Sequence, residues 1–299
     1  MRRTACLAAA ALVAASEVFG VETADFLRLQ PGARATGLGE AVVAAPEGLD
    51  AFTVNPAGLA LKPGRVAGFT HAELFEDTRL DHAAYAQSVG EGMAAGVSLL
   101  RLSHGRLEGH DTAAARSGSF VAADTAVSVA FARKAAPGLV AGAALKYVDS
   151  QIADTHGRGV AADLGAVWSR EDGPVPFSLG AAALHLGPGL KRDRERESLP
   201  ATLSVGAAAR PVKEALVAVD VRHRPNASGT ELSLGGEYAI IEAFRLRAGY
   251  ALRPGAGAGG ASGLGAGFGL TLSKLAIDYA FSPYGELGNS QRVSLSVRF

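Results

Sequence analysis

The feature that most constrains this chain is an alternation of apolar with small or polar residues, repeated in segments of about ten residues from Arg65 onward. The clearest example is the last segment, whose apolar positions are Val293, Leu295, Val297 and Phe299. The positions between them are arginine or serine. Successive side chains of a β-strand point to opposite faces, so the pattern predicts strands with one apolar and one polar face.

The segments number fourteen and differ in how they are joined. They lie at about 65–72, 79–89, 92–102, 122–133, 138–149, 157–169, 176–186, 200–210, 215–224, 230–239, 244–253, 262–272, 274–282 and 290–299. Short turns, such as 90–91, alternate for the most part with longer loops, such as 103–121 and 187–199. An even number of strands with short turns on one side and long loops on the other is typical of an outer-membrane barrel. We therefore expect an all-β fold, a transmembrane antiparallel β-barrel of fourteen strands over residues 63–299, with both termini in the periplasm.

The first twenty residues are typical of a secretory signal peptide. Arg2 and Arg3 precede an uncharged apolar run at 5–15, and we place the cleavage site after Gly20. This run is shorter than the roughly 20 residues that a spanning helix needs. Export, together with the strand pattern, predicts location in the bacterial outer membrane.

Composition excludes several classes of protein. Lys and Arg together number 29, as do Asp and Glu, so the chain lacks the excess positive charge of a nucleic-acid-binding protein. The single cysteine, Cys6, excludes a disulfide framework and a multi-cysteine metal site. We expect contacts with outer-membrane lipid and lipopolysaccharide, the latter through Arg192, Arg194 and Arg196, and no nucleic-acid partner.

Residues 21–62 differ from the rest because prolines interrupt them and no strand alternation is present. Asn55 precedes Pro56, which restricts its backbone to extended geometry, and the Asn side chain can bond nearby backbone. Asn55, Pro56, Ala57 and Gly58 are therefore predicted to form a sharp corner. Two interpretations remain open: a purely structural corner, or part of a plug that gates the barrel lumen.

Signatures of enzymes and cofactor sites are absent or out of context. Gly255, Gly257 and Gly260 match a dinucleotide-binding pattern, but a strand-like segment follows them where that pattern requires a helix. His104, Glu108, His110 and Asp111 crowd a long loop without forming a recognisable metal-ligand pattern. We therefore predict no catalytic residues, no cofactor and no metal.

Four charged residues fall on the polar face of adjacent predicted strands. Arg245 and Arg247 would oppose Glu237 and Glu231 on the inner wall of the barrel. They can be ion pairs that stiffen the barrel or a selectivity lining for an anionic solute.

The segment 26–60 resembles the start of the PorV/PorQ family of outer-membrane proteins and, more distantly, of the FadL-type transporters. The resemblance rests on Phe26-Leu27, on Gly32-Ala33-Arg34-Ala35, on a small-residue strand at 37–45 and on Asn55-Pro56-Ala57-Gly58-Leu59. Thr70-His71, the stretch 99–111 and the terminal Phe299 are also similar. The resemblance implies a FadL-like barrel of fourteen strands whose N-terminal segment sits within or under the lumen.

Two functions follow from this resemblance, and neither is enzymatic. Similarity to PorV implies an accessory of protein export or surface assembly, with secretion-system components or exported proteins as partners. Similarity to FadL implies the alternative, a channel for the uptake of hydrophobic small molecules. Phe299 ends a strand of the kind that barrel assembly machinery recognises, so we expect it to act as the C-terminal assembly signal.

Overall fold

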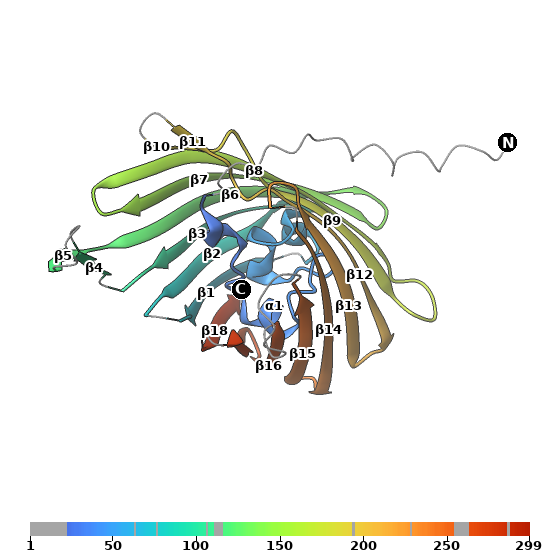
Figure 1. Ribbon diagram of the computed structural model, residues 1–299. Helices are drawn as coiled ribbons and strands as arrows, with labels where there is room; N and C mark the ends of the chain where they lie inside the picture. The colour runs from blue at the N-terminus through green and yellow to red at the C-terminus, as the bar shows by residue number, and fades with distance from the viewer. Residues whose placement is uncertain are drawn as a thin grey trace.

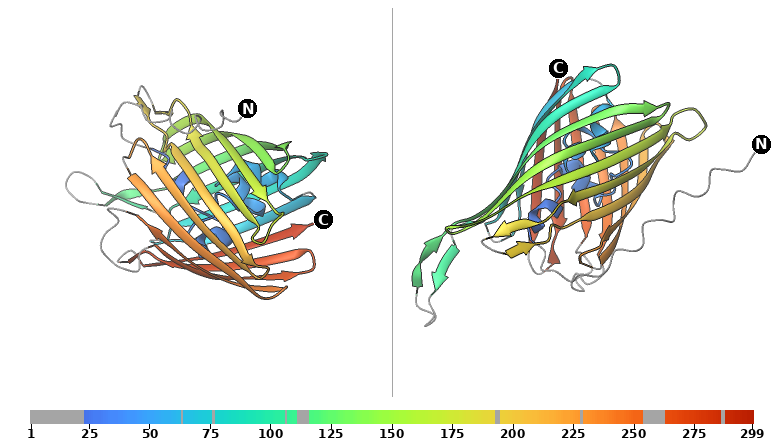
Figure 2. Two further views of the ribbon diagram at one scale, coloured as in Figure 1. Left: turned by 90° about the vertical axis from the view of Figure 1, so that its right-hand side faces the viewer. Right: turned by 90° about the horizontal axis from the view of Figure 1, so that it is seen from above.

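The computed structural model describes residues 23–299 except 63, 76, 106, 111–115, 193–194, 228, 254–262 and 286–287. Its main element is a single antiparallel sheet (Figure 1). The strands of the ring are β1 (Arg65–Glu73), β2 (Arg79–Gly90), β3 (Met93–Ser103), β6 (Ala122–Ala136), β7 (Leu139–Ile152), β8 (Thr155–Arg170), β9 (Phe177–Leu186), β12 (Thr202–Val212), β13 (Ala215–Arg224), β14 (Gly229–Ile241), β15 (Phe244–Leu252), β16 (Leu264–Leu272), β17 (Leu275–Pro283) and β18 (Asn289–Arg298). Each pairs with its neighbour in the chain, and β1 pairs with β18, so the fourteen strands close into a barrel (Figure 2).

All fourteen predicted strands are present, and their bounds agree with the prediction to within a few residues. Four short strands were not predicted. The hairpin of β4 (Leu107–His110) and β5 (Arg116–Phe120) extends from the loop after β3, and β10 (Leu190–Arg192) and β11 (Glu195–Glu197) extend the sheet from β8. No described helix has the length and apolar composition needed to cross a membrane.

The alternation of side chains determines what faces outward and what faces the lumen. On β7, Leu145 and Tyr147 are exposed on the outer surface, whereas Lys146 and Val148 between them are buried. On β18, Val293 and Leu295 are exposed and Arg292 and Ser294 are buried. The apolar face of each strand therefore covers the outside of the barrel, as the period of two requires.

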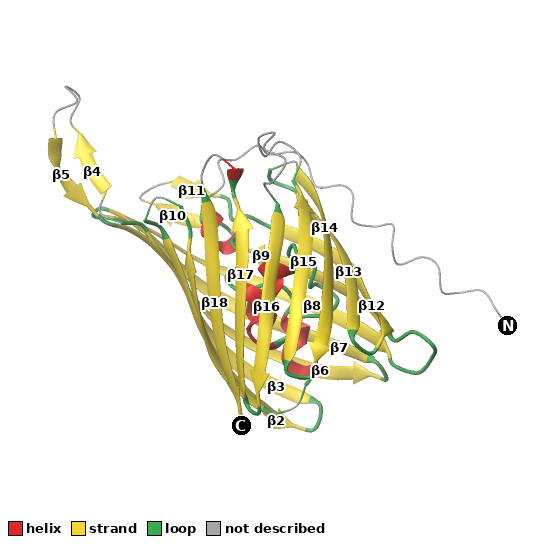
Figure 3. Cartoon of the chain, turned by 90° about the horizontal axis from the view of Figure 1, so that it is seen from below, coloured by secondary structure: helices red, strands yellow, loops and turns green. Residues whose placement is uncertain are grey.

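Residues 23–62, named here the inner segment, lie inside the barrel (Figure 3). Their short helices are η1 (Asp25–Arg28), α1 (Ala33–Gly37), η2 (Gly48–Phe52) and η3 (Pro56–Ala60). α1 contacts β15 to β18, and η3 contacts β6, β7 and β8 on the other side of the lumen. Residues 37–45 form no strand, in contrast to the small-residue strand that the family resemblance implies, because turns replace it after α1.

The two ends of the described chain lie at opposite ends of the barrel. The amide of Thr23 donates to the carbonyl of Ser198 among the long loops, whereas the amide of Phe299 donates to that of Arg65 at the short-turn end. The expectation that both termini lie on the short-turn side concerns, for the N-terminus, residues before Thr23, which lie outside the described part of the chain. The inner segment runs through the lumen before β1 begins, so it carries the chain from one end to the other.

Candidate functional site

The lumen is the candidate functional site, and the inner segment fills much of it. Most side chains from Phe26 to Ala60 are buried, including Arg34, Asp50 and Asn55. A barrel wall with large inward side chains would leave no room for such a segment. The wall must therefore carry very small inward side chains wherever the backbone of the inner segment approaches it.

Glycines provide this room. Seven inward-facing glycines would place a Cβ atom within 2.8 Å of the inner segment, at Gly142, Gly165, Gly180, Gly235, Gly249, Gly265 and Gly96. Several are direct cross-strand partners: Gly142 with Gly165, and Gly249 with both Gly235 and Gly265. Since neighbouring strands carry glycine at the same level, the wall has a recess that matches the path of the inner segment.

Asn55 attaches the predicted corner to the wall. Its Nδ2 donates to the carbonyl of Val43 within the inner segment (2.9 Å) and to those of Ala166 on β8 (3.2 Å) and Ala181 on β9 (3.3 Å). Its Oδ1 accepts from the amide of Ala57 (3.1 Å), which caps the N-terminus of η3 with Pro56 at its first position. Ala57 and Gly58 lie in that helix and are buried. The four corner residues are thus brought together, and the side chain of Asn55 bonds the wall directly.

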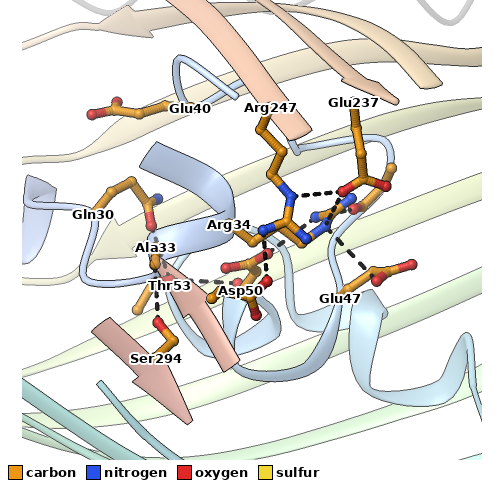
Figure 4. Close-up of polar contacts among 12 residues, drawn as sticks. Gln30, Ala33, Arg34, Glu40, Glu47, Asp50, Thr53, Glu237, Arg247 and Ser294 are labelled. Carbon is orange, nitrogen blue, oxygen red and sulfur yellow. Dashed lines mark hydrogen bonds and ion pairs between the residues drawn. The ribbon is translucent and has the colours of Figure 1, made fainter. Parts of the chain in front are cut away.

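Arg34 lies at the centre of a buried group of charges (Figure 4). Its guanidinium is 3.2 Å from Asp50 and 3.8 Å from Glu47 in the inner segment, and 3.7 Å from Glu237 on β14. Arg247 on β15 also bonds Glu237, at 2.7 Å. The group therefore joins the inner segment to the wall through opposite charges on both.

Burial and pairing shift the pKa values of these groups in different directions. Burial lowers the pKa of Arg34, but the carboxylates of Glu47, Glu237 and Asp50 outweigh it and raise the pKa above its usual value. Burial raises the pKa of Asp50 to about 6, although the guanidinium of Arg34 opposes the change. Asp50 is therefore the carboxyl of this group that takes up a proton near neutral pH.

A second ionic group lies nearer the long loops, around Glu40. Its carboxylate is 2.6 Å from Arg253, the residue directly after β15, and 3.0 Å from Arg222 on β13. Arg222 also donates to the backbone carbonyl of Glu40. Burial raises the pKa of Glu40, but the two arginines outweigh it and lower the pKa to about 2. Glu40 therefore stays ionised and holds the inner segment to the same side of the wall, around β13 to β15, nearer the long loops.

The four predicted lumen charges divide between these groups. Glu237 and Arg247 are buried and paired with each other, and Arg247 also bonds Asp278 (2.6 Å). Arg245 lies 3.9 Å from Glu237 at the edge of the same group. Glu231 belongs to the second group, where it pairs with Arg224 (2.8 Å) and Arg253 (3.4 Å).

The strand pattern alone does not reveal which charges of the inner segment join these groups. Arg34 and Glu40 stand in a stretch without periodicity, and their partners on the wall lie 182 positions or more away in the sequence. The only available signal was the presence of charged residues in an otherwise small and apolar stretch.

Two apolar clusters lie in the lumen, one in its long-loop half and one in its short-turn half. The long-loop half contains Phe26, Leu27, Leu80, Leu100, Leu102, Val148, Leu190 and Leu199. The short-turn half contains Leu49, Phe52, Leu59, Ala86, Ala130, Val140 and Val167. Sequence alternation placed polar faces in the lumen, but on β2, β3 and β7 leucine, valine and alanine occupy inward positions as well.

A row of buried polar residues separates the two clusters, and we call it the polar belt. It consists of Ser294, Thr70, His82, Ser98, Ser128, Lys146, Asp163 and His185. Ser294, Thr70 and His82 are direct partners on β18, β1 and β2, and Ser98, Ser128 and Lys146 on β3, β6 and β7. Lys146 forms an ion pair with Asp163 on β8, with Nζ 2.6 Å from Oδ2.

His185 joins this belt through an irregularity of the backbone. Alternation on β9 would turn it outward, but its φ of 59° and a shift in the β8–β9 pairing bring it inward. Its amide donates to Oδ1 of Asp163 (2.8 Å), and its ring Nδ1 is 3.4 Å from the Lys146 amine. Sequence periodicity cannot show such a bulge, because it depends on the neighbouring strand.

Other sequence predictions fall on the surface or outside the described residues. Phe299 is exposed at the short-turn end. Among the described residues, no group of three or more His, Cys, Asp or Glu side chains is arranged to hold a metal ion. The signal peptide 1–20, Asp111, Arg194 and the glycines 255, 257 and 260 lie outside the described residues. Arg192 is described, and it lies 3.7 Å from Glu197.

No protein-family model matches the sequence, and no curated protein matches it. Solved structures match over almost the whole chain. The toluene transporter TodX of Pseudomonas putida is 14% identical with a TM-score of 0.66, over 91% of this chain and 99% of that chain. The monoaromatic hydrocarbon channel CymD (13%, TM-score 0.57) covers 91% and 97%, and a FadL homologue from Pseudomonas aeruginosa (13%, TM-score 0.56) covers 95% and 99%.

At this identity the similarity establishes the fold, a closed FadL-like barrel of fourteen strands. The fold predicted from the alternating segments is therefore confirmed. The structural matches named above are FadL-like channels, and nothing among them supports the resemblance to PorV/PorQ.

Proposed function

We propose that this protein is an outer-membrane channel for hydrophobic small molecules, which is the alternative that the sequence left beside an export role. The similar structures include a toluene transporter and a monoaromatic hydrocarbon channel, both transporters of apolar solutes by their descriptions. They are not enzymes, and the described lumen contains ion pairs and apolar clusters that hold the fold together.

The observation that carries the proposal is the apolar long-loop half of the lumen. Water-filled porins have polar lumens, in which inward positions alternate with lipid-facing apolar ones. Here Leu80, Leu100, Leu102 and Val148 all face inward and are buried. A wall of this kind offers an apolar solute a favourable place to enter, since burial of apolar surface contributes roughly 25 cal/mol per Å².

The outer surface supports a membrane location. Large apolar side chains such as Val129, Leu145 and Val205 are exposed there at 58 to 69%. Trp168 packs edge-on against Phe177, with ring centroids 5.5 Å apart, near the short-turn end. An apolar band with aromatic residues near its edge is what the interface between membrane and water favours.

Uptake of radiolabelled toluene by cells tests the proposal. The host is a Gram-negative strain without its own channels for hydrophobic compounds, and the control solute is a sugar of similar mass. We expect faster uptake of toluene with the protein than with an empty vector, and no change for the sugar. Equal toluene uptake in both strains, with the heat-modifiable protein present in the outer-membrane fraction, would reject the proposal.

A matched pair of variants links uptake to the lumen. Leu100→Ser places a hydroxyl in the inward apolar cluster, whereas Leu99→Ser makes the same change on the outward face of the same strand. We expect only Leu100→Ser to reduce toluene uptake. Equal effects of both variants would mean that the inward cluster is not on the route.

A further inference from the structure

His82 is the residue of the polar belt whose hydrogen-bonding capacity is unused. Its ring is 1% exposed, and neither Nδ1 nor Nε2 has a hydrogen-bond partner among the described residues. A buried polar group without a partner is unfavourable, because its hydration is lost and not replaced, so such groups are rare in native proteins. Other members of the belt differ in this respect, since Thr70 bonds Ser294 (2.8 Å) and Lys146 bonds Asp163.

The surroundings of His82 are apolar on one side and polar on the other. Leu100 is its direct partner on β3, and Leu80 precedes it by one inward position, so the long-loop apolar cluster begins at its ring. Thr70 is its partner on β1. An apolar solute that enters this cluster would therefore reach the imidazole with its leading end.

The inner segment covers this position. Phe52 of η2 lies edge-on to the His82 ring, with centroids 6.4 Å apart and planes at 70°. Gly96 on β3 gives Phe52 its room, because a Cβ atom there would lie 2.6 Å from its ring. Phe52 is therefore one of the side chains that bury the His82 ring, and it does so from the short-turn side of the polar belt.

We propose that the polar belt recognises apolar solutes that carry one uncharged hydroxyl group, such as phenols, by hydrogen bonding to His82. A neutral imidazole offers one donor and one acceptor, and a hydroxyl group offers the same pair. The charges of Lys146 and Asp163 neutralise each other, so a carboxylate would bring an uncompensated charge into a buried site. This inference specifies the solutes of the channel proposed above and rests on that proposed function.

Three probes with the same ring separate the chemical alternatives: toluene, p-cresol and p-toluate. Binding is followed by NMR on the full-length protein labelled with ¹⁵N in histidine, at neutral pH. We expect p-cresol to shift the ring-nitrogen signals of His82 and to bind about tenfold more tightly than toluene, as one added hydrogen bond implies. Stronger binding of p-toluate than of p-cresol would overturn the inference and point to Lys146 instead.

Variants distinguish hydrogen bonding from packing. His82→Leu should lose the tenfold preference for p-cresol and keep its affinity for toluene, whereas His82→Gln, which retains a donor and an acceptor, should keep the preference. His71→Leu is the matched control, since His71 lies on the adjacent strand and bonds Asp81 on the outer side. Heat-modifiability on gels confirms that each variant folds.

The outcomes also separate this inference from the channel function. If cells take up toluene through the protein but p-cresol and toluene bind equally, the belt does not select hydroxyl groups and the channel function stands. If neither toluene nor p-cresol is taken up or bound, the channel function itself fails. Phe52→Ala should raise p-cresol affinity by uncovering His82, and a loss of affinity in this variant would contradict the proposed position of the solute.

Discussion

The side-chain amide of Asn55 occupies the space that a Cβ atom on Gly165 would need. The two residues are 110 positions apart, and the local sequence explains the corner at Asn55 but not the glycine at 165. Together they explain why a corner motif in the inner segment and a glycine in the middle of a strand occur in the same chain. The relationship also shows that the inner segment is bonded to the wall rather than loosely placed in the lumen.

Substitution of Gly165 should therefore displace the corner without preventing barrel formation. In Gly165→Val the new side chain collides with Asn55 and Pro56, and we expect faster hydrogen exchange over residues 23–62. Gly236→Val on β14 is the control, because a Cβ atom there has no neighbour closer than 3.9 Å. Equal exchange in the two variants would show that the recess does not position the inner segment.

Loss of the Asn55 amide should open the lumen more than loss of the Pro56 ring. Asn55→Ala leaves the carbonyls of Val43, Ala166 and Ala181 without this donor, whereas Pro56→Ala only relaxes the backbone. If the inner segment is a plug, single-channel conductance in planar bilayers rises in the order wild type, Pro56→Ala, Asn55→Ala.

A control for this series removes a comparable amide bond elsewhere. Asn226→Ala deletes the bond from Asn226 to the carbonyl of Leu199 among the long loops and should leave conductance unchanged. Unchanged conductance in all variants, with heat-modifiability intact, would reduce the corner to a structural role.

Docking of the inner segment should be strongest near pH 5. The pKa of Asp50 is raised to about 6 from 3.8, so Asp50 binds a proton more tightly when the inner segment is docked in the lumen. The free energy of docking therefore becomes more favourable as pH falls from 8 towards 5. The lowered pKa of Glu40, about 2, means that its contribution is complete above about pH 4.5 and is lost below it.

Hydrogen exchange over residues 23–62, corrected for its intrinsic pH dependence, measures this effect. We expect protection to rise by on the order of tenfold between pH 8 and pH 5. Asp50→Asn cannot take up the proton, so its corrected protection should rise less over this interval than that of the wild type, and any remaining rise would come from other carboxyl groups that bond the inner segment, such as Asp220, which accepts from the amide of Val43. The same rise in this variant would assign the pH dependence to another group.

Deletion of Phe299 should lower the yield of folded barrel. Its ring is exposed just after the short-turn end of β18, and its amide adds a bond to the carbonyl of Arg65 at the end of the β1–β18 ladder that closes the barrel. Deletion removes both the aromatic end and this bond. The band of heat-modifiable protein in outer-membrane fractions measures the yield, with Phe299→Tyr as the variant that should retain it. Undiminished yield after deletion would contradict an assembly role for this residue.

What the sequence determined by itself is the part of the structure that depends on local geometry. The strands, their number and the outward direction of Val293 and Leu295 follow from a side-chain period of two, which every segment carries within about ten residues. The corner at Asn55-Pro56 is also local, since the proline restricts the residue before it. These features do not depend on residues that are distant in the chain.

The tertiary structure decided everything that depends on residues distant in the chain. The pairing of Arg34 with Glu237, the position of Thr23 among the long loops and the inward turn of His185 each require a neighbour that the local sequence does not specify. The physical reason is that closure of the barrel encloses the inner segment, and burial there makes unpaired charges and colliding Cβ atoms costly. Glycines of the wall and charges of the inner segment acquire their roles only when that enclosure exists.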